Sequence, residues 1–223
     1  MKRIGCFHAH YSNIEQIDKA LSAYDVECIH FVDPGLDRMK NDPDFSHERA
    51  ERKVLDTLNW IAQSHVDAIL VTCTFYAGMI RDEIHRFPVP VVKIDDPLFR
   101  DLLNGVQPLV LVFTNPNTVA GTLDRLRRFF EGHGATLDAE ARMIPGTFEL
   151  LMQGKKEPYI EQVTNGLVGI ARELPEKTIV AAQLSMVPAA QRAEEAAGTK
   201  IGNAAGSLAE YIGRLLSLAN KPR

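Results

Sequence analysis

IGCFHAHYSNIEQIDKAL (Ile4–Leu21) and VLVFTNPNTVAGTLDRLR (Val110–Arg127) share one pattern: an apolar strand, a polar loop and an amphipathic helix. The two segments align at an offset of 106 residues. The paired positions include Phe7 with Phe113, His8 with Thr114, Ser12 with Thr118, Ile17 with Leu123, and Asp18 with Asp124. Two similar halves are the simplest explanation, and chance agreement between βα units is the alternative.

The correspondence continues at the next apolar strand of each half. VDAILVTCTFYAG (Val66–Gly78) matches KTIVAAQLSMVPAA (Lys177–Ala190), and in both segments polar residues follow the apolar run. Because strand-like runs alternate with helical patterns along nearly the whole chain, we predict an α/β fold with two pseudo-symmetric halves, each built on a parallel sheet. We expect one half to comprise residues 1–97 with 203–223, and the other residues 98–202.

The expected elements follow from the apolar runs and the helical periodicity. We predict strands over Arg3–Phe7, Val26–Val32, Ala68–Cys73, Val89–Ile94, Leu109–Thr114, Ala139–Met143 and Thr178–Ala182. We predict helices over Ser12–Tyr24, Ser46–Ser64, Gly78–Phe87, Thr118–His133, Glu157–Leu174 and Ala204–Ala219. Ser12 and Glu15 have the spacing of a capping box, in which each side chain bonds a free amide at the start of the helix.

Composition and charge exclude several classes of function. The 223 residues carry a net charge of −4 without a basic run, so nucleic acid is not an expected partner. No apolar stretch approaches the ~18 residues of a membrane span, and the start MKRIGCFHAH lacks the apolar core of a secretory signal, so we expect a cytoplasmic protein. The three cysteines lack C-x-x-C spacing, which argues against a disulfide scaffold and a cysteine zinc site.

Four polar loops follow predicted strands: His8–Ser12, Cys73–Gly78, Thr114–Thr118 and Gln183–Ala189. Ligands of parallel sheets bind at the carboxyl ends of the strands, so these loops are the expected site. Cys73 precedes a predicted helix, whose amides would favour the thiolate; the alternative is a small core residue. The Thr114–Thr118 loop offers hydroxyls and free amides to an anion, or else only caps its helix. It lacks the nucleotide-binding glycine motifs, so we favour a carboxylate ligand over a nucleotide phosphate.

Histidines raise the question of a metal. His8 and His10 lie two residues apart and can face the same way, which would let them share a metal; a proton-shuttling role and a structural role are the alternatives. Further potential ligands follow no known spacing, namely Asp33, His30, His47 and Glu48. We therefore predict no metal and no other cofactor. Cys6 and Cys28 lie inside apolar strand patterns, and we attribute both to packing.

Together these motifs resemble the aspartate/glutamate/hydantoin racemase superfamily over most of the chain. VTCTFYAG around Cys73 is similar to the first cysteine motif of the family, VFTNPNTVAGTLDRL to its strand–Thr–helix segment, and VAAQLSMVPAA to the second cysteine motif. FVDPGLDRM, residues 31–39, resembles the loop that closes over substrate. The resemblance implies two α/β halves with the active site in the cleft between them, and frequently a homodimer.

The resemblance also implies cofactor-free proton transfer at the α-carbon of a small carboxylate. Racemases of the family use two cysteines on opposite faces of that carbon. Here the first is Cys73, but Gln183 stands where the second belongs, and an amide cannot exchange a proton near neutral pH. Decarboxylases with one active cysteine and isomerases of unsaturated diacids also belong to the superfamily. Cys73 would then protonate an enediolate on one face, with His8 or His10 as a candidate partner.

We expect the substrate carboxylate to be held by hydroxyl and amide groups, with Cys73 at the α-carbon. The candidate binding residues are Ser12, Asn13, Thr74, Thr114, Thr118, Gln183 and Ser185. Arg38, Arg81, Lys93 and Arg142 are further candidate partners of a carboxylate, or else surface residues in solvent. Two rivals remain open: a catalytically lapsed protein that binds an acidic metabolite, and a metal-dependent hydrolase that uses His8 and His10.

Overall fold

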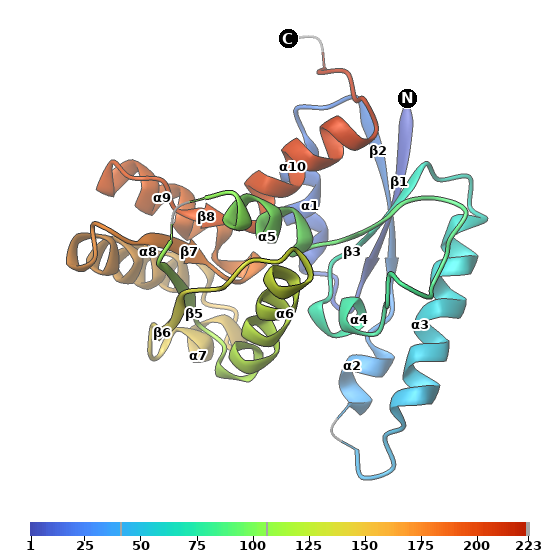
Figure 1. Ribbon diagram of the computed structural model, residues 1–223, viewed down its shortest axis with the longest axis horizontal. Helices are drawn as coiled ribbons and strands as arrows, with labels where there is room; N and C mark the ends of the chain where they lie inside the picture. Colours follow the sequence, from blue (N-terminus) through green and yellow to red (C-terminus); the bar gives the residue numbers. More distant parts are fainter. Residues whose placement is uncertain (41, 106, 222–223) are drawn as a thin grey trace. The chain divides into compact units, whose positions relative to one another are not determined.

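The chain divides into two compact units in the computed structural model, which describes residues 1–40, 42–105 and 107–221 (Figure 1). Unit 1 is Met1–Pro97 with Leu208–Arg223, and unit 2 is Leu98–Ser207. Each unit contains a four-stranded sheet in which all paired strands are parallel. The predicted α/β fold with two similar parallel-sheet halves is confirmed.

Unit 1 alternates strands and helices along the chain. Its elements are β1 (Lys2–His8), α1 (Asn13–Leu21), β2 (Val26–Val32), α2 (Gly35–Met39), α3 (His47–Ala62), β3 (Ala68–Val71), α4 (Thr74–Gly78) and β4 (Val91–Lys93). The strand order is β2-β1-β3-β4, which makes β1 and β3 the central strands. The carboxyl ends of these two strands therefore lie side by side.

Unit 2 repeats this arrangement. Its elements are β5 (Leu109–Phe113), η1 (Pro116–Thr118), α6 (Val119–Gly132), β6 (Ala139–Met143), α7 (Thr147–Met152), α8 (Lys156–Glu173), β7 (Thr178–Ala181), η2 (Leu184–Met186), α9 (Val187–Ala197) and β8 (Gly202–Asn203). The strand order β6-β5-β7-β8 matches that of unit 1 strand for strand. Two further helices, α5 (Asp96–Leu103) and α10 (Ala204–Leu215), cross the boundary between the units in sequence.

Helix α3 packs against one face of the unit 1 sheet. Ser46 starts the helix, because its hydroxyl accepts a hydrogen bond from the Arg49 amide (3.3 Å). The buried residues of the helix recur at helical spacing and meet apolar side chains of β1 and β3; they are Ala50, Val54, Leu58 and Ile61. Each fully buried aliphatic side chain contributes about 1.5–3 kcal/mol to the free energy of folding. On the other face lies α1, whose Asp18 reaches His30 of β2 (3.0 Å).

The core of unit 2 forms between its sheet and the pair α8 and α9. The shared cluster contains alternate residues of β5 and β7 together with the apolar faces of both helices; among them are Val110, Val112, Ile179, Tyr159, Val163, Leu167, Ala189 and Ala193. Alternation places every second strand residue on this face. Helix α6 buries Leu126 and Phe130.

The expected helix over Gly78–Phe87 is wrong. The helix of this region begins directly after Cys73, at Thr74, and Gly78 is its last residue. The apolar spacing of the following residues suggested a helix, but the Ile80 carbonyl accepts a hydrogen bond from the buried Lys93 ammonium (2.9 Å). The Arg81 amide donates to the His85 ring instead of to a helical carbonyl (3.0 Å). Among the described helices, none combines the length and apolar composition that a membrane crossing requires.

Candidate functional site

Cys73 is the residue that caps the N-terminus of α4, at the carboxyl end of β3. Its side chain forms no capping hydrogen bond, but the nearby backbone N–H groups of Tyr76 and Phe75 favour the thiolate, as the sequence suggested. Burial outweighs them and raises the pKa of the thiol to about 11, with a further rise from Asp37 and an opposing effect of Lys40. At neutral pH Cys73 is therefore a thiol, a proton donor rather than a base.

Polar side chains from neighbouring strand ends accompany Cys73. The Thr74 hydroxyl donates to the Asp95 carboxylate (3.2 Å), which is buried. The amide of Asn13 donates to the Thr72 hydroxyl (3.3 Å). The buried Tyr76 donates its hydroxyl proton to the Asp33 backbone carbonyl, and burial raises the pKa of that phenol. The predicted residues Asn13, Cys73 and Thr74 thus lie just beyond the ends of β1 and β3, where Asn13 begins α1, Cys73 precedes α4 and Thr74 begins α4.

The histidines of the first loop differ sharply in environment. His8 is fully buried, with Nδ1 bonded to the Thr72 hydroxyl (2.9 Å) and Nε2 to His30 Nδ1 (2.9 Å). Burial, with a contribution from His30, lowers the pKa of His8 to about 4, so the ring is neutral at pH 7. Both ring nitrogens of His8 are hydrogen-bonded within the protein, so we do not propose His8 as the proton-transfer partner of Cys73.

His10 is exposed, and its Nδ1 bonds the hydroxyl (2.8 Å) and backbone amide (3.2 Å) of Ser12. The capping role expected of Ser12 is wrong, because its side chain forms no hydrogen bond with the helix backbone. The Ser12 backbone is itself in the helical region, whereas a capping residue is usually extended.

Gln183 occupies the polar loop of unit 2. Its amide oxygen accepts hydrogen bonds from the Thr114 N–H (2.6 Å), the Thr114 hydroxyl (2.8 Å) and the Asn115 N–H (3.0 Å). Its amide nitrogen donates to the Thr118 hydroxyl (3.0 Å). The sequence predicted that this loop offers free amides to an anion. That prediction is wrong for Thr114 and Asn115, because both backbone amides already donate to the side-chain oxygen of Gln183.

Tyr159 is a polar residue of this loop region that the sequence analysis missed. Its buried hydroxyl lies between the hydroxyls of Thr114 (3.2 Å) and Ser185 (3.0 Å), and burial raises the pKa of the phenol. It comes from α8, far from both loops in sequence. The hydroxyl of a tyrosine on the buried face of a helix needs a polar partner, and this requirement could have indicated from the sequence that Tyr159 contacts polar residues.

The basic residues considered for carboxylate binding are mostly engaged. Arg81 pairs with Glu51 (2.5 Å), Lys93 with Asp82 (2.8 Å), and Arg142 with Glu140 (3.2 Å). Arg38 is exposed on α2.

A cluster of potential metal ligands lies elsewhere than the pair His8 and His10. One ligand atom each of Cys6, His8 and His30 lie within 4.8 Å of one another. The thiol of Cys6 donates to the Ile4 carbonyl (3.7 Å), and the neighbouring Cys28 thiol together with burial raises the pKa of Cys6 above its ordinary value. The sequence signal for this cluster is a Cys-x-His tripeptide that occurs in two strands and matches no known ligand spacing.

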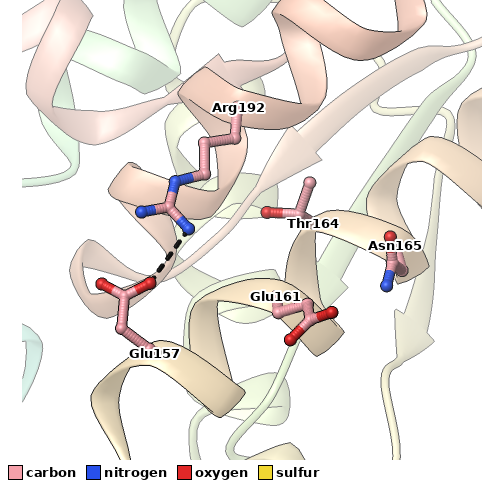
Figure 2. Close-up of a pocket in the computed structure, with 5 residues that line it drawn as sticks. All are labelled: Glu157, Glu161, Thr164, Asn165 and Arg192. Carbon is pink, nitrogen blue, oxygen red and sulfur yellow. Dashed lines mark hydrogen bonds and ion pairs between the residues drawn. The ribbon is translucent and has the colours of Figure 1, made fainter.

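A surface pocket of about 270 Å³ lies between α8 and α9 (Figure 2). Its described lining residues are Glu157, Glu161, Thr164, Asn165 and Arg192, and the predicted site residues are not among them. Figure 2 shows the guanidinium of Arg192 turned toward Glu157, with which it pairs at 3.2 Å. The pair is largely exposed, so it contributes little to stability.

Solved structures that match this fold include racemases. An aspartate racemase from Picrophilus torridus matches at a TM-score of 0.69 over 99% of this chain and 96% of its own, with 10% identity. An aspartate racemase homologue from Pyrococcus horikoshii gives 0.68 over 97% and 100%, with 16% identity. An allantoin racemase from Pseudomonas fluorescens gives 0.61 over 96% and 91%, with 14% identity. The expected resemblance is thus confirmed as one of fold. No protein-family model and no curated protein matches the sequence.

Proposed function

We propose that this protein acts on a small carboxylate, and that the Cys73 thiol delivers a proton to its α-carbon from one side. The observation that carries the proposal is the place of Cys73, at the carboxyl end of β3 and the start of α4, and a pKa raised to about 11 gives it a proton to donate at neutral pH. This half-buried thiol lies at the edge where ligands of parallel sheets bind. The racemase-like fold supports a reaction at an α-carbon by analogy.

The proposed step needs no reactant other than the substrate, the Cys73 thiol and water. Carbon dioxide leaves the α-carbon, and the electrons of the broken C–C bond remain on the substrate as an enediolate. The α-carbon then takes the proton of Sγ, and the electrons of the S–H bond stay on sulfur. The N–H groups of Phe75 and Tyr76 and the charge of Lys40 favour the resulting thiolate, which water reprotonates.

Gln183 favours one-sided protonation over racemisation. A racemase needs a second group that exchanges protons, and an amide does not titrate near neutral pH. The four hydrogen bonds of Gln183 also hold its side chain in place. We therefore place decarboxylation of a substituted malonic acid ahead of racemisation.

Deuterium incorporation tests this function. Wild-type protein is incubated in D₂O with amino acids, disubstituted malonic acids and cis-unsaturated diacids, and products are followed by NMR. We expect one acid to yield a product with deuterium at the α-carbon, and Cys73→Ser to lower that rate by about 100-fold or more. Circular dichroism of Cys73→Ser checks that the fold is retained. No incorporation with wild type, or an equal rate with folded Cys73→Ser, contradicts the proposal.

A second candidate, a protein that binds an acidic metabolite without turnover, is favoured by one observation. Gln183 already satisfies the Thr114 and Asn115 amides, which an active enzyme would offer to its substrate. Titration calorimetry with the same acids separates the two functions. Binding of an acid that wild type leaves unchanged in D₂O would support the binding protein, whereas Cys73-dependent turnover would exclude it.

A further inference from the structure

Two Cys-x-His tripeptides lie on neighbouring strands of unit 1. Cys6 and His8 belong to β1, and Cys28 and His30 to β2. Side chains alternate along a strand, so each Cys shares a face with the His two residues later. The register pairs Cys6 with His30, which brings all four side chains to one face of the sheet. The intervening residues face the other way and pack into the core beside α3.

Three of the four side chains already lie close enough together to share one ion. The ligand atoms of Cys6, His8 and His30 lie within 4.8 Å of one another, and Cys28 lies beside Cys6 on the same face of the sheet. In a tetrahedral zinc site, bonds of about 2.3 Å to sulfur and about 2.0–2.1 Å to nitrogen place the ligand atoms roughly 3.3–3.8 Å apart. The three atoms would therefore adjust their spacing around an ion, and Cys28 would supply the fourth ligand.

The outer nitrogens of both rings are held by oxygen atoms. His30 Nε2 meets the Asp18 carboxylate at 3.0 Å, and a carboxylate only accepts, so Nε2 carries the proton. His8 Nδ1 meets the Thr72 hydroxyl at 2.9 Å, and that hydroxyl donates to the Phe7 carbonyl (3.3 Å). Thr72 Oγ1 donates to His8 Nδ1 or accepts from it according to which ring nitrogen of His8 carries the proton.

The inner nitrogens, His8 Nε2 and His30 Nδ1, form a hydrogen bond at 2.9 Å, so a single proton lies between them. A Zn²⁺ ion that displaces this proton would be coordinated by both nitrogens, and the outer nitrogen of each ring would then donate to its oxygen partner. An imidazole whose outer N–H donates to a carboxylate or another oxygen is the usual arrangement around a bound metal.

The geometry points to a zinc site formed by Cys6, His8, Cys28 and His30. Two thiolates and two imidazoles are a ligand set typical of structural Zn²⁺, and four protein ligands leave no open position for substrate. The ion would join β1 to β2 and, through Asp18, to α1. It would also fix Thr72, which directly precedes Cys73.

Unit 2 provides an internal comparison. The positions that correspond by offset and register carry Val112, Thr114, Glu140 and Arg142. There Glu140 and Arg142 form an ion pair (3.2 Å). Because the second half forms the same sheet without a single Cys or His at these positions, the fold itself does not require the four residues in unit 1.

Zinc and cobalt binding to the full chain tests the site. The protein is kept in a phosphine reductant, freed of metal, and titrated with Zn²⁺ against a chromophoric chelator and separately with Co²⁺. We expect one equivalent of either metal, tetrahedral d–d bands, and a thiolate-to-Co²⁺ charge-transfer band. Cys28→Ser should weaken that band and the affinity, His30→Gln should abolish tight binding, and Asp18→Asn should weaken zinc binding by about 10–100-fold.

Cys73→Ser and His10→Gln are the matched controls, because each removes a thiol or an imidazole outside the cluster. Both should bind one equivalent with the wild-type cobalt spectrum. Circular dichroism shows whether each variant is folded before titration. Absence of stoichiometric binding by wild type, a cobalt spectrum without thiolate charge transfer, or unchanged affinity in both Cys28→Ser and His30→Gln would overturn the site.

Discussion

The amide of Gln183 forms the densest set of polar contacts in the loop after β7. Replacing Gln183 by Ala removes the acceptor of three hydrogen bonds and leaves donors of Thr114 and Asn115 in a partly buried place. We expect Gln183→Ala to lower the free energy of unfolding by about 1–3 kcal/mol, measured by urea denaturation. Gln63→Ala, at an exposed position, is the control and should change it by less than about 0.5 kcal/mol. Equal effects of the two substitutions would contradict this structural role.

The titration of Cys73 gives a second prediction for a single residue. Because its pKa is raised, the thiolate forms at a higher pH in the folded protein than in the unfolded chain. The alkylation rate of Cys73 should therefore keep rising with pH toward about 11, measured by mass spectrometry of the peptide that contains it. The unfolded chain releases this proton first, so the contribution of Cys73 to stability is present below its unfolded pKa and is lost as pH rises toward 11. A rate that levels off near neutral pH would show a reactive thiolate and contradict the assignment of Cys73 as an acid.

Some of the candidate site was accessible from the sequence, because Cys73, Thr114 and Gln183 follow apolar runs in the manner of strand-end loops. The hydrogen bonds that these residues form were not predictable from the sequence. The contact between Gln183 and Thr114 depends on side-chain reach across neighbouring strands. The pKa of Cys73 depends on burial by distant segments, which outweighs the local effect of the helix amides that the sequence revealed.

At the scale of elements, close packing of α8 against Ile144, the residue that follows β6, rests on one glycine. A Cβ added at Gly166 would lie 2.6 Å from Ile144, whereas at Gly169 it would meet nothing within 4 Å. We expect Gly166→Ala to lower the free energy of unfolding by about 1–3 kcal/mol through overpacking. Gly169→Ala, three residues later on the same helix, should raise it by up to about 1 kcal/mol through helix propensity. Equal thermal unfolding shifts of the same sign for the two variants would contradict this packing.

Long elements with clear periodicity were predictable, and short ones were not. The strands over Val26–Val32 and Ala139–Met143 have the predicted bounds, and α3 begins after the predicted Ser46. The two-residue strand Gly202–Asn203 has no pattern of its own and exists through pairing with β7. The expected helix over Gly78–Phe87 does not form, because a tertiary hydrogen bond from Lys93 and a local side-chain hydrogen bond to His85 replace the helical pattern.

At the scale of the whole molecule, the internal offset predicted two similar halves, and the repeated strand order confirms them. Strand order itself was beyond the sequence pattern, since alternating strands and helices fit several parallel-sheet topologies. The homodimer expected from the resemblance stays a prediction, which sedimentation velocity over a range of concentrations would check.

The central claim is that Cys73 protonates one face of the α-carbon, and the configuration of the deuterated product tests it most directly. Wild-type protein is given, in D₂O, a disubstituted malonic acid that it turns over, so that the new C–D bond creates a stereocentre. Chiral chromatography then separates the two enantiomers of the product. The account predicts one enantiomer, formed at a rate that collapses in Cys73→Ser, because a single thiol serves a single face. Equal amounts of both enantiomers, formed equally fast by Cys73→Ser, would contradict it.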